Sequence, residues 1–286
     1  MSTPASSSSS VTEEKQAPTL AELVRKYDTE NLIEFLKEQK DLQLDETHFE
    51  ILRNEITGRT FLKLTKEEFM QDGLKRGPAT TLADYAKEIK EKKLRAFSSY
   101  RSLREVLLRY DLDSDGTESI PLFTLPTYEI QDNDKHFAHC MAEILVRLKN
   151  YGTLLVDSLE SMRNEYVVAL LHSALHIVRD DTQKEFNMRP QHEITGEKST
   201  GRVDYAIKET EDLICITEDK QHKVPMGYAQ NIAQLESSFE TNKKKRKASE
   251  AFDDDFDYLY GIVTTGKYGI LIVFLMITSL KIIHKF

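Results

Sequence analysis

A chain of 286 residues with 40% hydrophobic side chains is long enough for two domains of ordinary size. Its net charge of −9 excludes a broad basic surface, so any contact with nucleic acid must be local. Cys140 and Cys215 lie far apart inside apolar runs, which indicates reduced thiols in an intracellular protein and excludes a disulfide framework. The first residues lack the apolar core of a signal peptide.

Residues 1–17 are dominated by serine, threonine, proline and charged side chains. Such a segment cannot bury enough apolar surface to offset the entropy lost on folding, so we expect a disordered tail. Residues 18–95 carry apolar side chains at helical spacing and predict a small all-α unit, with Thr19 as the cap of its first helix. The expected helices cover residues 19–24, 30–39, 45–54 and 79–94, with a further apolar segment at 56–69.

Two consecutive motifs characterise this unit. They are Ile56-x-Gly58-x-x-Phe61-Leu62-x-Leu64-Thr65-x-Glu67-Glu68-Phe69 and Gly73-x-Lys75-x-Gly77-Pro78-Ala79. On these motifs, residues 18–95 resemble the sterile alpha motif (SAM) domain, a five-helix bundle, although Tyr27 stands where tryptophan is frequent. The resemblance implies protein association, often in head-to-tail polymers, and occasionally RNA binding. The expected partner is another SAM domain or a second copy of this chain.

Head-to-tail association needs two complementary faces on one bundle. An acidic and a basic set of side chains could supply them: Asp41, Asp45, Glu46 and Glu50 on one side, and Lys75, Arg76 and Lys87 on the other. The alternative is that both sets are ordinary solvated faces.

Residues 96–130 are expected to form a linker. Within it, the stretch from Asp111 to Gly116 looks like the start of an EF-hand loop. That interpretation fails because position 12 of the loop would be Leu122 instead of a bidentate glutamate, and position 8 would be Glu118. We expect an acidic connector that becomes extended near Pro121 and Pro126.

Residues 131–267 predict a second domain, and residues 131–190 are expected to be helical. One helix covers residues 136–148, and a longer one covers residues 158–178. The pairs His136 with His139 and His172 with His176 have a spacing that metal ligands can use. A zinc site needs four ligands and no Cys-x-x-Cys partner exists, so helix-surface histidines are the expected outcome.

Two short strands follow, at residues 202–207 and 213–220, separated by the polar break 209–212 that signals a hairpin. Because side chains alternate along a strand, Glu218 and Lys220 project together while Asp219 points away. Asp204, on the neighbouring strand, can reach the same patch. Two carboxylates and one amine suit Mg²⁺ or Mn²⁺ and a phosphate group. The alternative is an exposed strand end without chemistry.

The order of these elements, a helix, a strand with Asp204, a strand with Glu218-Asp219-Lys220 and a helix, resembles the PD-(D/E)XK (restriction-endonuclease-like) nuclease superfamily. The resemblance implies an α/β core in which Asp204 and Glu218 hold the metal and Lys220 serves the hydrolytic water. The family often adds an acidic residue from the first core helix. Glu165 is our candidate for that ligand, and Glu143 is a weaker one.

Two further features predict contacts with DNA or RNA. Gln230 and Gln234 lie one turn apart on the expected helix at residues 228–235. A basic run forms a phosphate-contacting or nuclear-import-like patch in an exposed loop: Lys243, Lys244, Lys245, Arg246 and Lys247. A solvated loop without such a role is the alternative. For the protein as a whole, we expect an intracellular location, in the nucleus or the cytoplasm.

Residues 258–265 predict another strand, and residues 268–286 are apolar without alternation. A bilayer span needs about 17–20 apolar residues, which this segment reaches only if Lys267 and Lys281 snorkel. It is therefore either a C-terminal membrane anchor or a final strand of the sheet. The leading hypothesis is a metal-dependent nuclease with a SAM-like association module. The alternative is an inactive SAM-based scaffold or adaptor, either without a membrane anchor or with one at residues 268–286.

Overall fold

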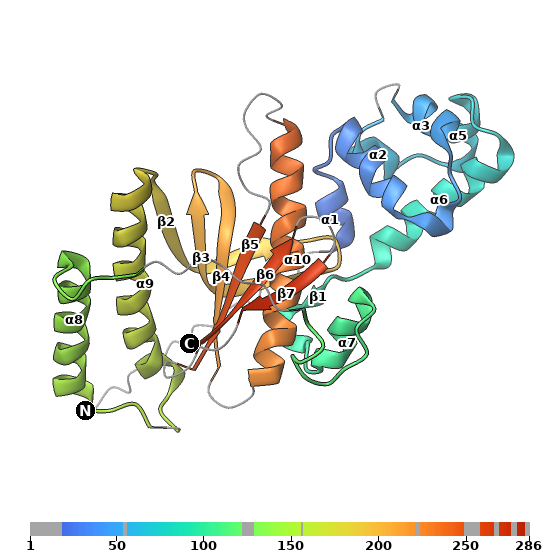
Figure 1. Cartoon of the computed structure of the whole chain (residues 1–286). Helices are drawn as coiled ribbons and strands as arrows, with labels where there is room; N and C mark the ends of the chain where they lie inside the picture. Colours follow the sequence, from blue (N-terminus) through green and yellow to red (C-terminus); the bar gives the residue numbers. More distant parts are fainter. Residues whose placement is uncertain are drawn as a thin grey trace, which may run out of the picture.

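A computed structural model of the chain describes residues 19–53, 56–121, 129–155, 157–220, 224–248, 258–265, 269–275 and 279–283, with the backbone alone for residues 246–248 and after residue 265. The expected tail, residues 1–17, lies outside these ranges. A helical bundle at the N-terminal side adjoins a sheet flanked by long helices (Figure 1).

The bundle consists of short helices that begin at capping side chains. The side chains of Thr19, Asp45 and Thr65 each accept a hydrogen bond from a backbone N–H in the first turn of the helix that follows, and the backbone N–H of each cap residue donates to a side chain of that turn. These bonds satisfy N–H groups that a helix cannot pair internally. The helices are α1 Leu20–Val24, α2 Thr29–Glu38, the 3₁₀ turn η1 Lys40–Leu42, α3 Glu46–Leu52, α4 Gly58–Phe61, α5 Lys66–Gln71 and α6 Arg76–Glu91.

The bundle core is apolar and closed. Leu32, Phe61, Phe69, Leu82 and Ile89 are fully buried, and they come from four of these helices. The described part of the bundle has six α-helices, so the expectation of five was wrong in detail. The apolar segment 56–69 forms two helices because the chain turns between α4 and α5, where Thr65 caps the second of them.

The segment expected to be a linker is instead part of the second core. It forms β1 Arg95–Ala96, the 3₁₀ turn η2 Phe97–Ser99, α7 Leu103–Leu107 and the 3₁₀ turn η3 Leu108–Tyr110. Leu103, Val106 and Leu107 are buried against α10 and the sheet. Their spacing is that of one helix face, which accounts for the correction. Residues 122–128 of the expected linker lie outside the described ranges.

The described strands form one mixed sheet. They are β2 Phe186–Thr195, β3 Ser199–Glu209, β4 Asp212–Asp219, β5 Tyr258–Thr264, β6 Gly269–Leu275 and β7 Ser279–Ile283, with β1. The order is β1-β3-β4-β5-β6-β7, and β2 also pairs with β3. Strands β2, β3 and β4 are antiparallel neighbours, whereas β5 runs parallel to β4.

Helices cover both faces of this sheet. Val167 and Leu171 of α9 (Glu160–Thr182) pack with Tyr205 on one face. On the other face, α10 (Val224–Ala248) packs Ile232 and its neighbours against Val203 and further strand residues. Helix α8 (Lys135–Tyr151) packs on α9, on the side away from the sheet (Figure 1). The helices expected at residues 136–148, 158–178 and 228–235 and the two central strands are therefore confirmed in type, with shifted bounds.

Strand β2 was missed, because residues 131–190 were expected to be helical throughout. Its sequence, FNMRPQHEIT, is polar and contains Pro190. Proline within a sheet is tolerated mainly on edge strands, and among the described strands β2 pairs with β3 alone. A polar edge strand lacks the alternation that identifies a half-buried strand.

The C-terminal residues extend the sheet. Strand β6 pairs antiparallel with β5, and β7 pairs antiparallel with β6. The strand alternative for residues 268–286 therefore holds for the described stretches 269–275 and 279–283. Among the described residues, no helix has the length and apolar character that a bilayer crossing requires. Both cysteines are free and buried, as expected.

Candidate functional site

Three predicted side chains gather where β3 and β4 approach β5. Lys220 follows β4, and its backbone N–H donates to the carbonyl of Thr264 on β5 at 2.9 Å. Its ammonium Nζ lies 2.6 Å from Oε1 of Glu218. Asp204 of β3 is close enough for its charge to raise the pKa of Glu218. The contact between Glu218 and Lys220 is the one that strand alternation predicted.

Both oxygens of Asp204 accept hydrogen bonds. The backbone N–H of Asp219 donates to Oδ2 at 2.7 Å. The side-chain amide of Gln191, on β2, donates to Oδ1 at 3.3 Å. Each carboxylate oxygen can accept a second bond, so Asp204 remains able to bind a cation.

Glu218 is buried, with 5% of its surface exposed, and its two oxygens are also engaged. Oε1 faces Lys220, and Oε2 accepts from the amide of Gln234 at 2.7 Å. Burial, followed by repulsion from Asp204, raises the pKa of Glu218 to about 6, against the opposing effects of Lys220 and Gln234. Burial alone would lower the pKa of Lys220, but Glu218 and Asp204 raise it overall, so the amine stays protonated.

Asp219 points away from this group, as predicted, and forms a buried ion pair. Its carboxylate lies 3.3 Å from Nε of Arg163 on α9, and the exposed fractions of the two side chains are 0% and 3%. Burial raises the pKa of Asp219 although Arg163 opposes the shift. Arg163 was missed in the sequence, although it precedes Tyr166 and Val167 on the buried stripe of α9. The pair ties α9 to the strand that carries Glu218.

Glu165 does not join Asp204 and Glu218. Its Oε2 lies 3.6 Å from Nε of Arg147 on α8, and Arg147 also binds Glu143 at 2.5 Å. Among the described residues, no group of three or more histidine, cysteine, aspartate or glutamate side chains could hold a metal ion. Glu160, earlier on α9, is the acid whose charge acts on Lys220 and Asp219. Glu160 was not singled out from the sequence.

The histidines of α8 and α9 lie on the helix surface, as expected. The rings of His136 and His176 stack with their centroids 5.4 Å apart, and Nε2 of His136 lies 2.8 Å from a carboxylate oxygen of Asp180. His139 and His172 are exposed. These contacts join the two helices and need no metal.

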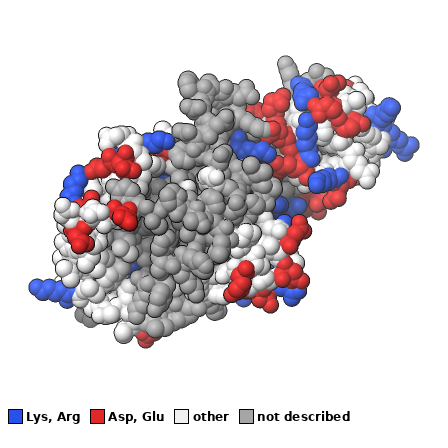
Figure 2. Space-filling view, in the orientation of Figure 1, with Lys and Arg blue, Asp and Glu red and all other residues white. Residues whose placement is uncertain are grey.

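The residues predicted to contact nucleic acid do not have the exposed positions that this role was expected to give them. Gln234 is buried against Glu218, and Gln230 is 4% exposed, so both side chains lie on the buried side of α10. The basic run continues that helix instead of forming a loop. Among the described residues seen in this view, basic and acidic side chains are interspersed and form no broad basic patch (Figure 2).

The described lysines of the run are engaged in ion pairs and hydrogen bonds. Lys243 binds Glu38 of α2 at 2.8 Å, and Lys244 lies 3.1 Å from Glu197 and bonds to the hydroxyl of Tyr27. Lys245 donates to the carbonyl of Glu211 at 2.8 Å. The side chains of Arg246 and Lys247 lie outside the described residues. A helix is favoured over a loop because these contacts hold it against the bundle and the hairpin.

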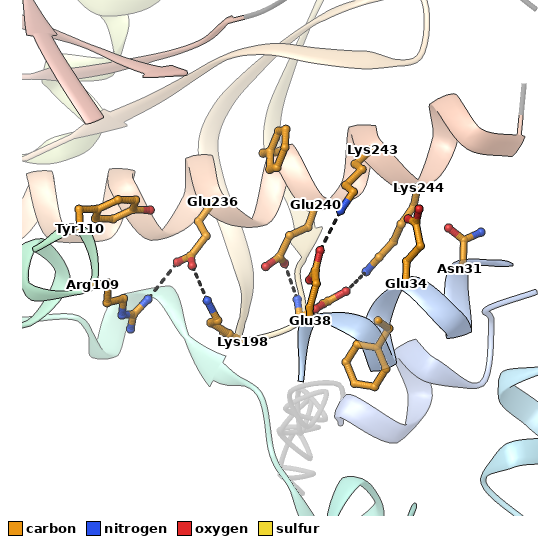
Figure 3. A pocket seen from close by; sticks show the side chains of 13 residues that line it. Asn31, Glu34, Glu38, Arg109, Tyr110, Lys198, Glu236, Glu240, Lys243 and Lys244 are labelled. Carbon is orange, nitrogen blue, oxygen red and sulfur yellow. Dashed lines mark hydrogen bonds and ion pairs between the residues drawn. The ribbon is translucent and has the colours of Figure 1, made fainter. Parts of the chain in front are cut away.

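A pocket of about 300 Å³ is lined by residues of the bundle, of α10 and of the β2–β3 turn (Figure 3). Its charged walls form a chain of ion pairs, in which Glu236 binds Arg109 at 2.9 Å and Lys198 at 2.8 Å. Glu240 accepts a bond from the backbone N–H of Glu197 at 2.6 Å. Burial, and then the charge of Glu197, raises the pKa of Glu240 to about 8.

The group at the end of β4 has the composition of a divalent-cation site with an adjacent amine. Burial, and then repulsion from Asp204, raises the pKa of Glu218, and a cation between the two carboxylates would offset both effects. Mg²⁺ typically takes one or two protein carboxylates and completes its shell with water and phosphate oxygens. Asp204 and Glu218 therefore fit such an ion, whereas the three-carboxylate set with Glu165 is not assembled.

The chain thus combines a SAM-like helical bundle with an α/β domain whose mixed sheet bears a carboxylate–lysine group. Residues 1–88 match the family described as SAM-like domain, which supports the predicted bundle. Crinkler effector protein 1 of Rhizophagus irregularis is 30% identical to the chain over 178 residues, which is 60% of this chain. The aligned part spans 36% of the relative's own length.

Proposed function

We propose that the α/β domain hydrolyses phosphodiester bonds of DNA or RNA with Mg²⁺ or Mn²⁺, while the SAM-like bundle binds other proteins. The observation that carries this proposal is the 2.6 Å contact between Lys220 and Glu218, with Asp204 beside them. The element order α9, β2, β3, β4, α10 also supports it, because a helix, the strand with Asp204, the strand with Glu218 and a second helix follow one another in the order that the nuclease resemblance implies, with β2 inserted after the first helix.

Each side chain of the group has a role in this proposal. Asp204 and Glu218 would hold the cation through their remaining lone pairs. When bound, the cation would neutralise charge on the phosphate and acidify a bound water. Lys220, as a protonated amine, would orient the water or stabilise charge that develops on the phosphate. Gln234 fixes Glu218, and the Asp219 N–H fixes Asp204.

The test is cleavage of plasmid DNA and of RNA by the full chain supplied with Mg²⁺ or Mn²⁺. Asp204→Asn and Lys220→Ala should each lower the rate by about 100-fold or more. Glu165→Gln is the matched control, because the described contact of Glu165 is with Arg147. It should retain cleavage, whereas the ligand role predicted from the sequence requires that it fail.

Two outcomes would overturn the nuclease proposal. One is undiminished cleavage by both Asp204→Asn and Lys220→Ala. The other is absence of cleavage by a folded protein at saturating metal with either substrate.

A scaffold without catalysis is the second candidate, and the family match of residues 1–88 favours it. The exposed Lys75 and Arg76 belong to the predicted basic face of the bundle. If the bundle forms head-to-tail assemblies, the double variant Lys75→Glu, Arg76→Glu should dissociate them in light scattering of the full chain. An unchanged mass would exclude this face. The two candidate functions are compatible with each other: one protein would bind its partner through the bundle and cut nucleic acid with the α/β domain.

A further inference from the structure

Gln191 has a backbone conformation that glutamine seldom adopts. Its φ is +49°, in the left-handed region, although it lies within strand β2. The pairing with β3 keeps one register on both sides, with Pro190 opposite Tyr205 and His192 opposite Val203. Gln191 is therefore directly opposite Asp204.

At this pair of residues, the alternation of side chains between the two faces of the sheet is interrupted on both strands. Met188 of β2 packs with residues on the α9 side of the sheet, whereas Ile194 packs with the core on the α10 side. On β3, Val203 belongs to the α10 side and Tyr205 to the α9 side. In a regular strand, residues separated by an even number share a face. The break in alternation therefore falls at Gln191 and Asp204 on both strands.

The side chain of Gln191 is exposed, so burial does not account for this geometry. What the distortion brings about is the contact with Asp204, in which the Gln191 amide donates to Oδ1 at 3.3 Å. The Asp219 N–H donates to the other oxygen. Backbone strain of this kind persists where the surroundings impose it, and it gathers at functional sites.

We infer that Gln191 is a positioning residue for Asp204. Together with the Asp219 N–H, it fixes the plane of the carboxylate and leaves one lone pair on each oxygen for a divalent cation. This inference rests on the proposed function. Glycine at position 191 would relieve the backbone and remove the amide at the same time.

The experiment measures Mn²⁺ binding to the full chain by calorimetry and, separately, urea unfolding without metal. Gln191→Gly should weaken Mn²⁺ binding about tenfold or more, as loss of a group that orients a metal ligand does. Its metal-free stability should be unchanged or higher. The matched control is Glu193→Gln, an exposed residue of the same strand opposite Arg202, which should change neither quantity.

The outcomes separate the two ideas. If Asp204→Asn abolishes Mn²⁺ binding but Gln191→Gly leaves the affinity intact, the positioning role is wrong and the metal site stands. If the wild-type chain binds no Mn²⁺, or Asp204→Asn binds it normally, the proposed function fails first. If Gln191→Gly loses metal-free stability along with affinity, the residue is structural and the inference is overturned.

Discussion

The charge of Arg163 is buried and is paired with one carboxylate, that of Asp219, while its guanidinium also donates to the carbonyl of Ser158. The side chains of Arg163 and Asp219 are almost fully buried, with exposed fractions of 3% and 0%. The desolvation of such a pair can cost as much as the pair gains, but removing one member leaves an uncompensated charge in the interior. The ion pair between Arg104 and Asp113 has a shorter N–O distance, 2.7 Å, yet both side chains are exposed.

We therefore expect Arg163→Met to lower the free energy of unfolding by about 3–5 kcal/mol. Arg104→Met, the matched control, should lower it by less than about 1 kcal/mol. Urea unfolding at neutral pH, followed by circular dichroism, compares the two. Equal costs for both variants would contradict a buried role for the Arg163 pair.

Glycine is required at position 58 by a close approach of two backbones. A Cβ atom there would lie 1.8 Å from the carbonyl oxygen of Val24, so the chain would have to move. Gly77, near the start of α6, has no atom within 4 Å of its ideal Cβ position. Glycine is therefore sterically required at position 58 but not at position 77, although both positions belong to the SAM-like motifs.

Gly58→Ala should destabilise the protein by about 1–3 kcal/mol, as overpacking does. Gly77→Ala should be neutral or stabilising by up to about 1 kcal/mol, because alanine is the better helix former. Thermal unfolding of the full chain measures both shifts. A loss of stability in Gly77→Ala as large as that in Gly58→Ala would show that free space does not decide the effect.

Residues whose roles follow from local geometry could be predicted from the sequence. Alternation along one strand placed Glu218 and Lys220 together and Asp219 on the other face. Arg163 could not be assigned, because its partner is 56 residues away and the contact exists only once α9 lies over β4. Gln191 could not be assigned either, since no local pattern predicts a positive φ within a strand.

At the scale of elements, α10 has a buried polar row instead of a simple apolar stripe. Asn231 donates to the carbonyl of Ile216 at 3.1 Å, and Gln234 donates to Glu218. Asn242 bonds to both backbone groups of Leu213, accepting from its N–H at 2.9 Å and donating to its carbonyl at 2.7 Å. These bonds fix the register of the helix along β4 from one end of the strand to the other.

Replacing Asn242 with alanine should leave two buried backbone groups of Leu213 without partners. The expected loss is about 1–3 kcal/mol for each group. Thr241→Ala is the neighbouring control, because its hydroxyl bonds within the helix to the carbonyl of Ser237. If urea unfolding gives Asn242→Ala and Thr241→Ala the same small cost, the polar row does not anchor α10.

Elements with strong periodicity were predicted, and those fixed by distant contacts were not. Helices α2, α6, α8 and α9 carry apolar residues at helical spacing, and the structure forms them with shifted ends. The polar edge strand β2 and the basic end of α10 are specified by neighbours far away in the sequence. Lys243, for example, pairs with Glu38 across 205 residues.

At the scale of the whole molecule, the joint between the two units is polar. Tyr27 of the bundle lies under Lys244, whose Nζ is 4.4 Å from the ring centroid, and its hydroxyl donates to Glu197 at 3.4 Å. The sequence predicted two units with a linker between them. It could not show that the β2–β3 turn and α10 meet the bundle directly, because no spacing or motif encodes these pairs.

We expect Glu240 to make the stability of the protein depend on pH. Its pKa rises from the ordinary 4.5 to about 8, chiefly through burial. The titratable groups whose charges act with it are Tyr27, Tyr110, Glu197, Lys198, Glu236 and Lys244. Between pH 4.5 and about 8 the folded protein keeps a proton that the unfolded chain has lost. The contribution of this proton to the free energy of unfolding is therefore fully present below pH 4.5 and declines as the pH rises through that window.

Glu240→Gln should remove this dependence, because the amide is neutral throughout and its oxygen can still accept from the Glu197 N–H. The wild-type chain should lose up to about 1.4 kcal/mol per pH unit relative to the variant between pH 5 and 8, with a constant difference above pH 9. Urea unfolding of both proteins across this range measures the difference. Parallel stability curves would mean that Glu240 titrates normally, and the pocket would then admit enough water to solvate its charge.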